Sequence, residues 1–111
     1  MRIVLLLVGC LLAGCQNLDV SRTLGARCDQ STDCNERCLV PSGDWPGGFC
    51  TITCDSKANC PSDSACIDEQ GGVCAYSCVG DGDCTFLGTG YTCQAVDSHG
   101  AGAKVMVCRG G

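Results

Sequence analysis

The sequence predicts a small disulfide-rich fold of three tandem four-cysteine modules, each a turn followed by a β-hairpin, with little helix. The 111-residue chain contains 14 cysteines, and a Cys-x5-Cys spacing opens each of three repeats. Beyond the first eighteen residues the large apolar side chains are scattered along the chain. A packed core of normal size is therefore not expected, and disulfides must replace it.

The cysteine spacing divides the chain into repeats. Module 1 spans residues 28–50, module 2 residues 54–74 and module 3 residues 78–108, with three residues between neighbours. After the second cysteine of each module the gaps differ in length. A disulfide framework permits this variation, because lengthening a loop between fixed ends adds little closure entropy.

The first part of each module is a five-residue stretch between two cysteines. These stretches end in Asp33, Asn59 and Asp83. Such short polar side chains accept hydrogen bonds from nearby backbone amides and tolerate turn conformations. We therefore expect a turn or a single helical turn in each module.

The second part of each module predicts a hairpin with a glycine-bearing loop. Pro41 and Pro46 fall in the loop of module 1, where they cap strands rather than occupy them. The expected strands lie at residues 39–40 and 48–50, 66–68 and 73–74, and 91–96 and 104–108.

Four cysteines allow three pairings within a module. We favour a laced arrangement, first to third and second to fourth, because a bond from third to fourth would only tie the hairpin to itself. Spacing leaves the other pairings open, including bonds between modules. The favoured pairs are Cys28–Cys38, Cys34–Cys50, Cys54–Cys66, Cys60–Cys74, Cys78–Cys93 and Cys84–Cys108.

The amino terminus predicts export. Residues 1–14 have one basic side chain, Arg2, and an apolar run of eleven residues, which is shorter than the roughly 20 that cross a bilayer. The tetrapeptide Leu12-Ala13-Gly14-Cys15 resembles the lipobox of bacterial lipoproteins. This resemblance implies a signal peptide over residues 1–14 and a lipidated Cys15 as the first residue of the mature chain.

Cys10 lies in a similar tetrapeptide, but cleavage there would leave a very short apolar segment ahead of it. Cleavage before Cys15 leaves twelve further cysteines, an even number that three modules use completely. An ordinary signal peptide with a coincidental cysteine is the alternative. In bacteria with two membranes, the signal that retains a lipoprotein at the inner membrane resembles an Asp directly after the lipidated cysteine. Gln16 stands at this position, which favours the bacterial outer membrane, with the chain facing the periplasm or the cell surface.

Residues 15–27 are expected to form a lipidated, flexible tether that holds the modules off the membrane. Packing of this segment onto module 1 is the alternative, for which only Val20 and Leu24 offer apolar side chains. An exported chain with paired thiols belongs in an oxidising space.

Charge excludes one class of partner. The chain has 12 acidic and 7 basic residues and a net charge of -5. An acidic surface does not attract nucleic acid or anionic lipid head groups. The expected partners are the membrane, through the lipid anchor, and an extracellular protein or glycan.

Neither catalysis nor a cofactor is expected. The only histidine, His99, lies in a Gly/Ala-rich loop, and the sequence suggests no residue to orient it. Three Cys-x3-Cys spacings fall in the range of zinc ligands, but an oxidising compartment favours disulfides, so no metal is predicted.

Two aromatic residues are candidates for contact with a partner. Trp45 stands at the tip of the expected hairpin of module 1, and Phe86 lies in module 3. Trp45 either folds back as a small local core or acts as a contact residue. Aromatic side chains on stapled loops bind well, because the loop has little entropy left to lose.

The repeated Cys-x5-Cys, the steps Gly48-Phe49-Cys50 and Gly90-Tyr91-Thr92-Cys93 and the lipobox resemble the cysteine-rich repeat lipoproteins of the myxobacterial type. The modules are also loosely similar to EGF-like and Dickkopf amino-terminal modules. EGF modules have six cysteines and an internal Cys-x-Cys. The modules of this chain have four cysteines each and contain no Cys-x-Cys.

These features predict a lipid-anchored, disulfide-stapled binding or structural module of the cell envelope without catalytic activity. An extracellular protease inhibitor is the first alternative, with Arg37 or Lys57 as the exposed loop residue. A thiolate metal-binding protein is the second.

Overall fold

The structure is a computed structural model that describes residues 20–100 and 102–111. The expected signal peptide over residues 1–14, the lipidation site Cys15 with its alternative Cys10, and residues 15–19 of the expected tether lie outside the described residues.

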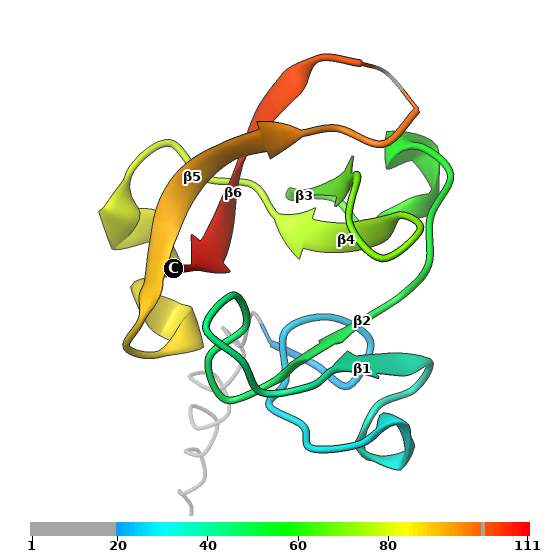
Figure 1. Ribbon diagram of the computed structural model, residues 1–111, viewed down its shortest axis with the longest axis vertical. Coiled ribbons are helices and arrows are strands. Elements are labelled where there is room, and N and C mark those ends of the chain that lie inside the picture. Colours follow the sequence, from blue (N-terminus) through cyan, green and yellow to red (C-terminus); the bar gives the residue numbers. More distant parts are fainter. Residues whose placement is uncertain (1–19, 101) are drawn as a thin grey trace, which may run out of the picture.

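Three antiparallel hairpins make up the described chain, each a two-stranded sheet of its own (Figure 1). The small disulfide-rich fold of three hairpin modules is therefore confirmed. The strands are β1 (Arg37–Leu39), β2 (Phe49–Thr51), β3 (Ser64–Ile67), β4 (Val73–Tyr76), β5 (Tyr91–Asp97) and β6 (Lys104–Gly110). Except in β5, the strands extend one or two residues farther from their loops than the sequence predicts, and β2 and β4 thereby enter the joints between modules.

A short 3-10 helix precedes each hairpin, which confirms the expected helical turn. These helices are η2 (Ser31–Asp33), η3 (Lys57–Asn59) and the longer η4 (Asp81–Leu87). In every module the last residue of the Cys-x5-Cys stretch accepts two backbone amides. Asp33 accepts from the amides of residues 29 and 30, Asn59 from 55 and 56, and Asp83 from 79 and 80, at 2.8–3.3 Å.

Six disulfides join each turn to the hairpin that follows it. They coincide with the laced pairs favoured from the sequence, first to third and second to fourth in each module. No disulfide among the described residues crosses a module boundary. The pairs are Cys28–Cys38, Cys34–Cys50, Cys54–Cys66, Cys60–Cys74, Cys78–Cys93 and Cys84–Cys108.

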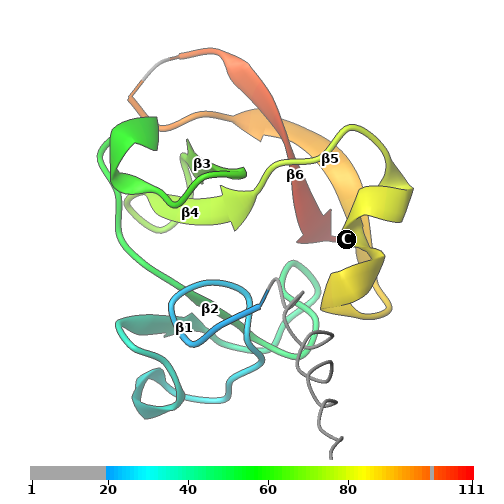
Figure 2. The same cartoon turned by 180° about the vertical axis from the view of Figure 1, so that it is seen from behind.

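Backbone hydrogen bonds also connect neighbouring modules. The amide of Cys74 donates to the carbonyl of Ile52, and the buried hydroxyl of Thr51 donates to the carbonyl of Cys74 at 2.6 Å. The amide of Cys78 donates to the carbonyl of Met106. Module 2 thus contacts both of the other modules, and both views show its hairpin beside β6 and above β2 (Figures 1 and 2).

The three modules share one core, contrary to the expectation that disulfides replace it. Each hairpin has too few large apolar side chains to enclose a core, but the three inner faces meet and bury them together. The fully buried large side chains are Leu39, Trp45, Phe49, Ile67, Val73 and Val107. Disulfides and apolar packing therefore stabilise the same unit.

Residues 20–27 are not a flexible tether, and this part of the prediction is wrong. Leu24 is 2% exposed and belongs to the shared core. The amide of Gly25 donates to the carbonyl of Cys50, and the amide of Cys50 donates to the carbonyl of Ala26. The segment therefore packs along β2, because one leucine and two backbone hydrogen-bonding groups find partners there.

The end of β6 returns to the tip of the β1–β2 loop. The amide of Gly110 donates to the carbonyl of Asp44 at 2.8 Å. Arg109 forms ion pairs with Asp44 at 3.1 Å and with Glu69 at 2.5 Å, and its guanidinium lies 6.0 Å from the ring centroid of Trp45. A single arginine thus joins residues of all three modules.

Candidate binding site

The five aromatic residues of the chain form one connected group. Phe49 lies at its centre, with ring centroids 5.0 Å from Trp45, 6.3 Å from Tyr76 and 6.4 Å from Tyr91. Phe86 extends the group through Tyr76, at 5.0 Å. The group therefore reaches from the shared core to the surface.

The two candidate contact residues differ in burial, since Trp45 is buried and Phe86 is exposed. Trp45 is 2% exposed, so its contact role is wrong and its folding back is observed. It packs into the core of all three modules rather than into a local one, since its neighbours include Phe49 and Arg109. Phe86 is 41% exposed on η4 and remains available for contact.

An open pocket lies beside Phe86. It has a volume of about 180 Å³ and is lined by Asp63, Tyr76, Ser77 and Phe86. The rings of Tyr76 and Phe86 stand nearly perpendicular to each other, at 81°. The pocket therefore combines two aromatic rings with one carboxylate, at the place where module 2 meets η4 of module 3.

Tyr76 is held in position from the side of the core. Its hydroxyl donates to the carbonyl of Leu24 at 3.0 Å. A Cβ atom at Gly25, where φ is +101°, would lie 2.9 Å from the Cε2 atom of Tyr76, so only glycine lets the backbone pass this ring. Residues 20–27, expected to be flexible, instead help to build the pocket.

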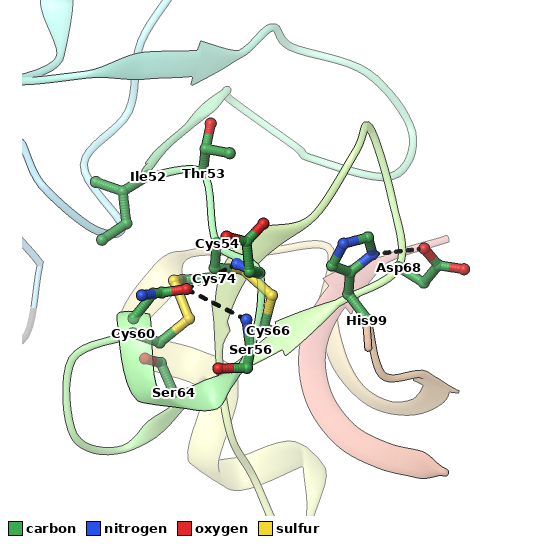
Figure 3. The surroundings of a disulfide bond; sticks show 12 residues. Ile52, Thr53, Cys54, Ser56, Cys60, Ser64, Cys66, Asp68, Cys74 and His99 are labelled. Atoms are coloured by element: carbon green, nitrogen blue, oxygen red, sulfur yellow. Dashed lines mark hydrogen bonds and ion pairs between the residues drawn. A yellow bond between two sulfur atoms is a disulfide. The ribbon is translucent and has the colours of Figure 1, made fainter. Parts of the chain in front are cut away.

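His99 has an orienting partner that the sequence analysis missed. Its Nδ1 atom lies 2.9 Å from Oδ1 of Asp68, and Figure 3 shows the imidazole turned toward that carboxylate. The ring is partly covered, with 29% of the side chain exposed. The expectation that no residue orients His99 is therefore wrong, because hairpin loops from modules 2 and 3 meet here.

A second pocket of about 230 Å³ lies next to His99, and its lining includes Ser56, Ala65, Cys66 and Val105. Ser56 uses its hydroxyl oxygen to accept the amide of Ala58 in the η3 turn. Among the described residues no serine, threonine or free cysteine is hydrogen-bonded to His99. The arrangement thus pairs a histidine with a carboxylate but gives it no nucleophile to activate.

Each module brings three sulfur atoms within 4.8 Å of one another; in module 2 they belong to Cys54, Cys60 and Cys74. Figure 3 shows both disulfides of this module side by side. A metal site would need thiolates, and each of these sulfurs is in a disulfide. Thiolate coordination would therefore require prior reduction of the disulfides.

The two basic residues named for protease inhibition are engaged within the chain. The guanidinium of Arg37 donates to the hydroxyl of Thr53 and the carbonyl of Gln70. The ammonium group of Lys57 donates to the carbonyl of Ser64 at 2.8 Å. Neither side chain extends freely from its loop as an inhibitor's contact residue does.

Within the described part of the chain, three groups have shifted pKa values. Two backbone amides hydrogen-bonded to Asp33, and two to Asp83, hold the pKa of each carboxyl below its usual range. Burial raises the pKa of Tyr91 to about 12, which the nearby charge of Arg27 partly opposes. The Tyr91 hydroxyl donates to the carbonyl of Pro46, so this tyrosine serves the core.

The sequence indicates Phe86 but not its companions in the pocket. Asp63 belongs to no pattern in the sequence, and Tyr76 and Ser77 belong to the joint between modules 2 and 3. The available signal was the position of Tyr76 two residues before Cys78, since a short joint brings its side chain against the following turn.

Comparison with protein-family models, curated proteins and solved structures finds no match for this chain. The class of protein therefore follows from the fold alone, which is that of a small extracytoplasmic disulfide-rich module. Six disulfides indicate an oxidising environment, the periplasm or the cell exterior. Within residues 20–100 and 102–111, no helix is long and apolar enough to cross a membrane.

Proposed function

We propose that this chain is a lipid-anchored, disulfide-stapled binding module of the bacterial cell envelope and has no catalytic activity. The observation that carries the proposal is the aromatic pocket, which lies on a fold stabilised by both disulfides and an apolar core. Six disulfides and one shared core fix Tyr76, and Phe86 is exposed beside it. Such fixed aromatic side chains bind a partner with little loss of conformational entropy.

We further propose that the chain is attached to the outer membrane through Cys15 and is akin to the cysteine-rich repeat lipoproteins of the myxobacterial type. The lipobox-like tetrapeptide and Gln16 support the attachment. Two acyl chains would make it stable, at about 0.8 kcal/mol per buried CH₂. Because residues 20–27 pack on β2, the folded unit would begin close to the membrane surface.

A protease inhibitor is a weaker candidate, because Arg37 and Lys57 are held by hydrogen bonds within the chain. A thiolate metal protein is also weaker, because every described cysteine is in a disulfide. Mass spectrometry of the native protein tests whether the cysteines form disulfides or bind a metal as thiolates. Six disulfides lower the mass by two hydrogens each, whereas bound metal with free thiols would overturn the proposal.

The lipid anchor is tested by Cys15→Ser in the expressed precursor. We expect the variant to keep its signal peptide and to lose labelling by a fatty-acid analogue, since no thiol remains to be acylated. Cys10→Ser is the matched control and should be processed and labelled as the unmodified chain is. Labelling of the Cys15→Ser protein would place the anchor elsewhere, with Cys10 first to be examined.

A further inference from the structure

We propose that the pocket formed by Asp63, Tyr76, Ser77 and Phe86 binds an alkylated ammonium group, such as trimethylammonium. This inference deepens the proposed binding function and rests on it, because it names the chemistry that the module would recognise. Geometry, charge and hydrogen-bonding capacity each support it independently.

The two rings are arranged so that one cation can contact both. Their centroids are 5.0 Å apart and their planes meet at 81°. Both rings line the pocket, so a cation seated there lies within about 6 Å of each centroid, the range of a cation–π contact. Perpendicular rings of this kind form two walls of a cage rather than a stack.

Charge favours a cation over an anion or a neutral group. The four lining residues include one carboxylate, Asp63, and no lysine or arginine. Among the described residues Asp63 takes part in no ion pair, whereas Asp44, Asp68 and Asp97 do. The backbone of Asp63 is fixed, because its carbonyl accepts the amide of Ser77 at 2.9 Å.

Hydrogen-bonding capacity favours an alkylated ammonium over a lysine side chain. An unmodified ammonium has three N–H donors, each of which needs an acceptor when it leaves water. The pocket offers the carboxylate of Asp63 and the hydroxyl of Ser77, while the hydroxyl of Tyr76 donates to Leu24. A quaternary ammonium has no donors to satisfy and gains fully from the rings.

The binding wall is preorganised. Tyr76 is fixed by Gly25, by the carbonyl of Leu24 and by the edge-to-face contact with Phe49. Phe86 is partly exposed and can adjust, but it lies on a helix closed by the buried Cys84–Cys108 disulfide. Little conformational entropy is therefore lost on binding.

Choline is the first probe, titrated against the full chain and followed by the NMR resonances of Phe86 and Tyr76. Dimethylbutanol, the uncharged carbon isostere of choline, is the matched control ligand. We expect choline to bind at least fivefold more tightly, because only its charge differs. Equal affinity for the two, or no shift of either ring with choline, would overturn the proposal.

Variants locate the binding to this pocket. Phe86→Leu should weaken choline binding about fivefold to thirtyfold, and Asp63→Asn should also weaken it. Met106→Leu is the matched control, because Met106 is 42% exposed against 41% for Phe86 but lies outside the pocket. Unchanged binding by Phe86→Leu would contradict the assignment. Unchanged near-ultraviolet circular dichroism would show that the variants fold.

Two sources of the ammonium group are separated by further probes. Phosphatidylcholine vesicles present it as a lipid head group, and a peptide with trimethyl-lysine presents it as a modified protein. Phosphatidylglycerol vesicles and the unmethylated peptide are the controls. Binding that Phe86→Leu abolishes with either probe supports the proposal; failure of both together with choline refutes it. Labelling of Cys15 is measured independently, so the two proposals can fail separately.

Discussion

Module 1 and module 2 have the same pattern of disulfides but use them in different surroundings. In module 1, Cys28, Cys34 and Cys50 form a small cluster of their own, beside Ala26 and Cys38. In module 2, Cys54, Cys66 and Cys74 belong to the shared core. The same disulfide pattern thus stabilises only its own module in module 1, whereas in module 2 it forms part of the core shared by all three modules.

This difference shows where the stability of the chain is concentrated. Both strands of module 2 are almost completely buried, and β4 lies between β2 and β6. Module 1 contributes Trp45 and Phe49 to the same core but keeps its turn outside it. We therefore expect damage in module 2 to spread and damage in the turn of module 1 to remain local.

The largest effect is expected from removing one disulfide in each module. Removal of either disulfide should reduce the free energy of unfolding by about 2–4 kcal/mol. The loss should be about 1 kcal/mol larger for Cys54→Ala with Cys66→Ala than for Cys28→Ala with Cys38→Ala. The two loops have similar separations, 12 and 10 residues, so loop entropy hardly distinguishes them. The excess comes from the cavity left in the core.

Thermal unfolding of the two double variants measures this difference, at about 4–8 °C for each kcal/mol. Equal midpoints would show that the modules are stabilised separately. Full reduction of the unmodified protein is the reference and should abolish the fold. Native circular dichroism after full reduction would instead mean that the apolar core suffices without disulfides.

A smaller effect is expected from removing the ion pairs through which Arg109 joins the modules. Arg109→Ala should reduce the free energy of unfolding by about 1–3 kcal/mol, because it leaves Glu69, only 23% exposed, without its partner. Lys104→Ala is the matched control, since the Lys104–Asp97 pair is 68% exposed on both sides and should contribute below about 0.5 kcal/mol. Urea unfolding measures both, and equal losses would contradict the bridging role of Arg109.

The smallest effect concerns acid. The pKa values of Asp33 and Asp83 are lowered in the folded chain, so their turns are stabilised above the ordinary aspartate pKa of about 3.9 and lose this as pH falls through the lower folded value. Asn59 in module 2 does not titrate. Hydrogen exchange of the turn amides below about pH 4 should therefore quicken in modules 1 and 3 only.

Two substitutions sharpen the acid comparison. Asn59→Asp should make the turn of module 2 acid-sensitive, because it introduces an acceptor that titrates. Asp33→Asn should remove the sensitivity of module 1, because it replaces a titrating acceptor by one that keeps its hydrogen bonds at low pH. Identical acid profiles in all three turns would disprove the assignment.

The parts of the fold that depend on local spacing were predictable. A cysteine spacing of five and a final Asp or Asn specify the turn, and the glycine-bearing loops specify the hairpins. The shared core was not predictable, because no module alone has enough apolar side chains to suggest it. Its existence depends on contacts between segments far apart in the chain.

The candidate site illustrates the same limit. Phe86 is indicated by the sequence as an aromatic residue on a stapled loop without an expected core beside it. Tyr76 reaches it from the joint between modules 2 and 3, and Asp63 from the residue before β3. Leu24 is bound to Tyr76 across 52 residues, and His99 to Asp68 across 31. Such pairs leave no periodic pattern in the sequence, so both were missed.

The return of β6 to the tip of module 1 also has a consequence for folding after export. A chain that enters the oxidising space from its amino terminus presents residues 28–50 first, and the two disulfides of module 1 can form there at once. The contacts of Arg109 with Trp45 and of Gly110 with Asp44 need residues that follow more than sixty positions later. Until these residues arrive, we expect an oxidised first module whose indole is not yet covered, an aromatic surface to which chaperones of that compartment can bind.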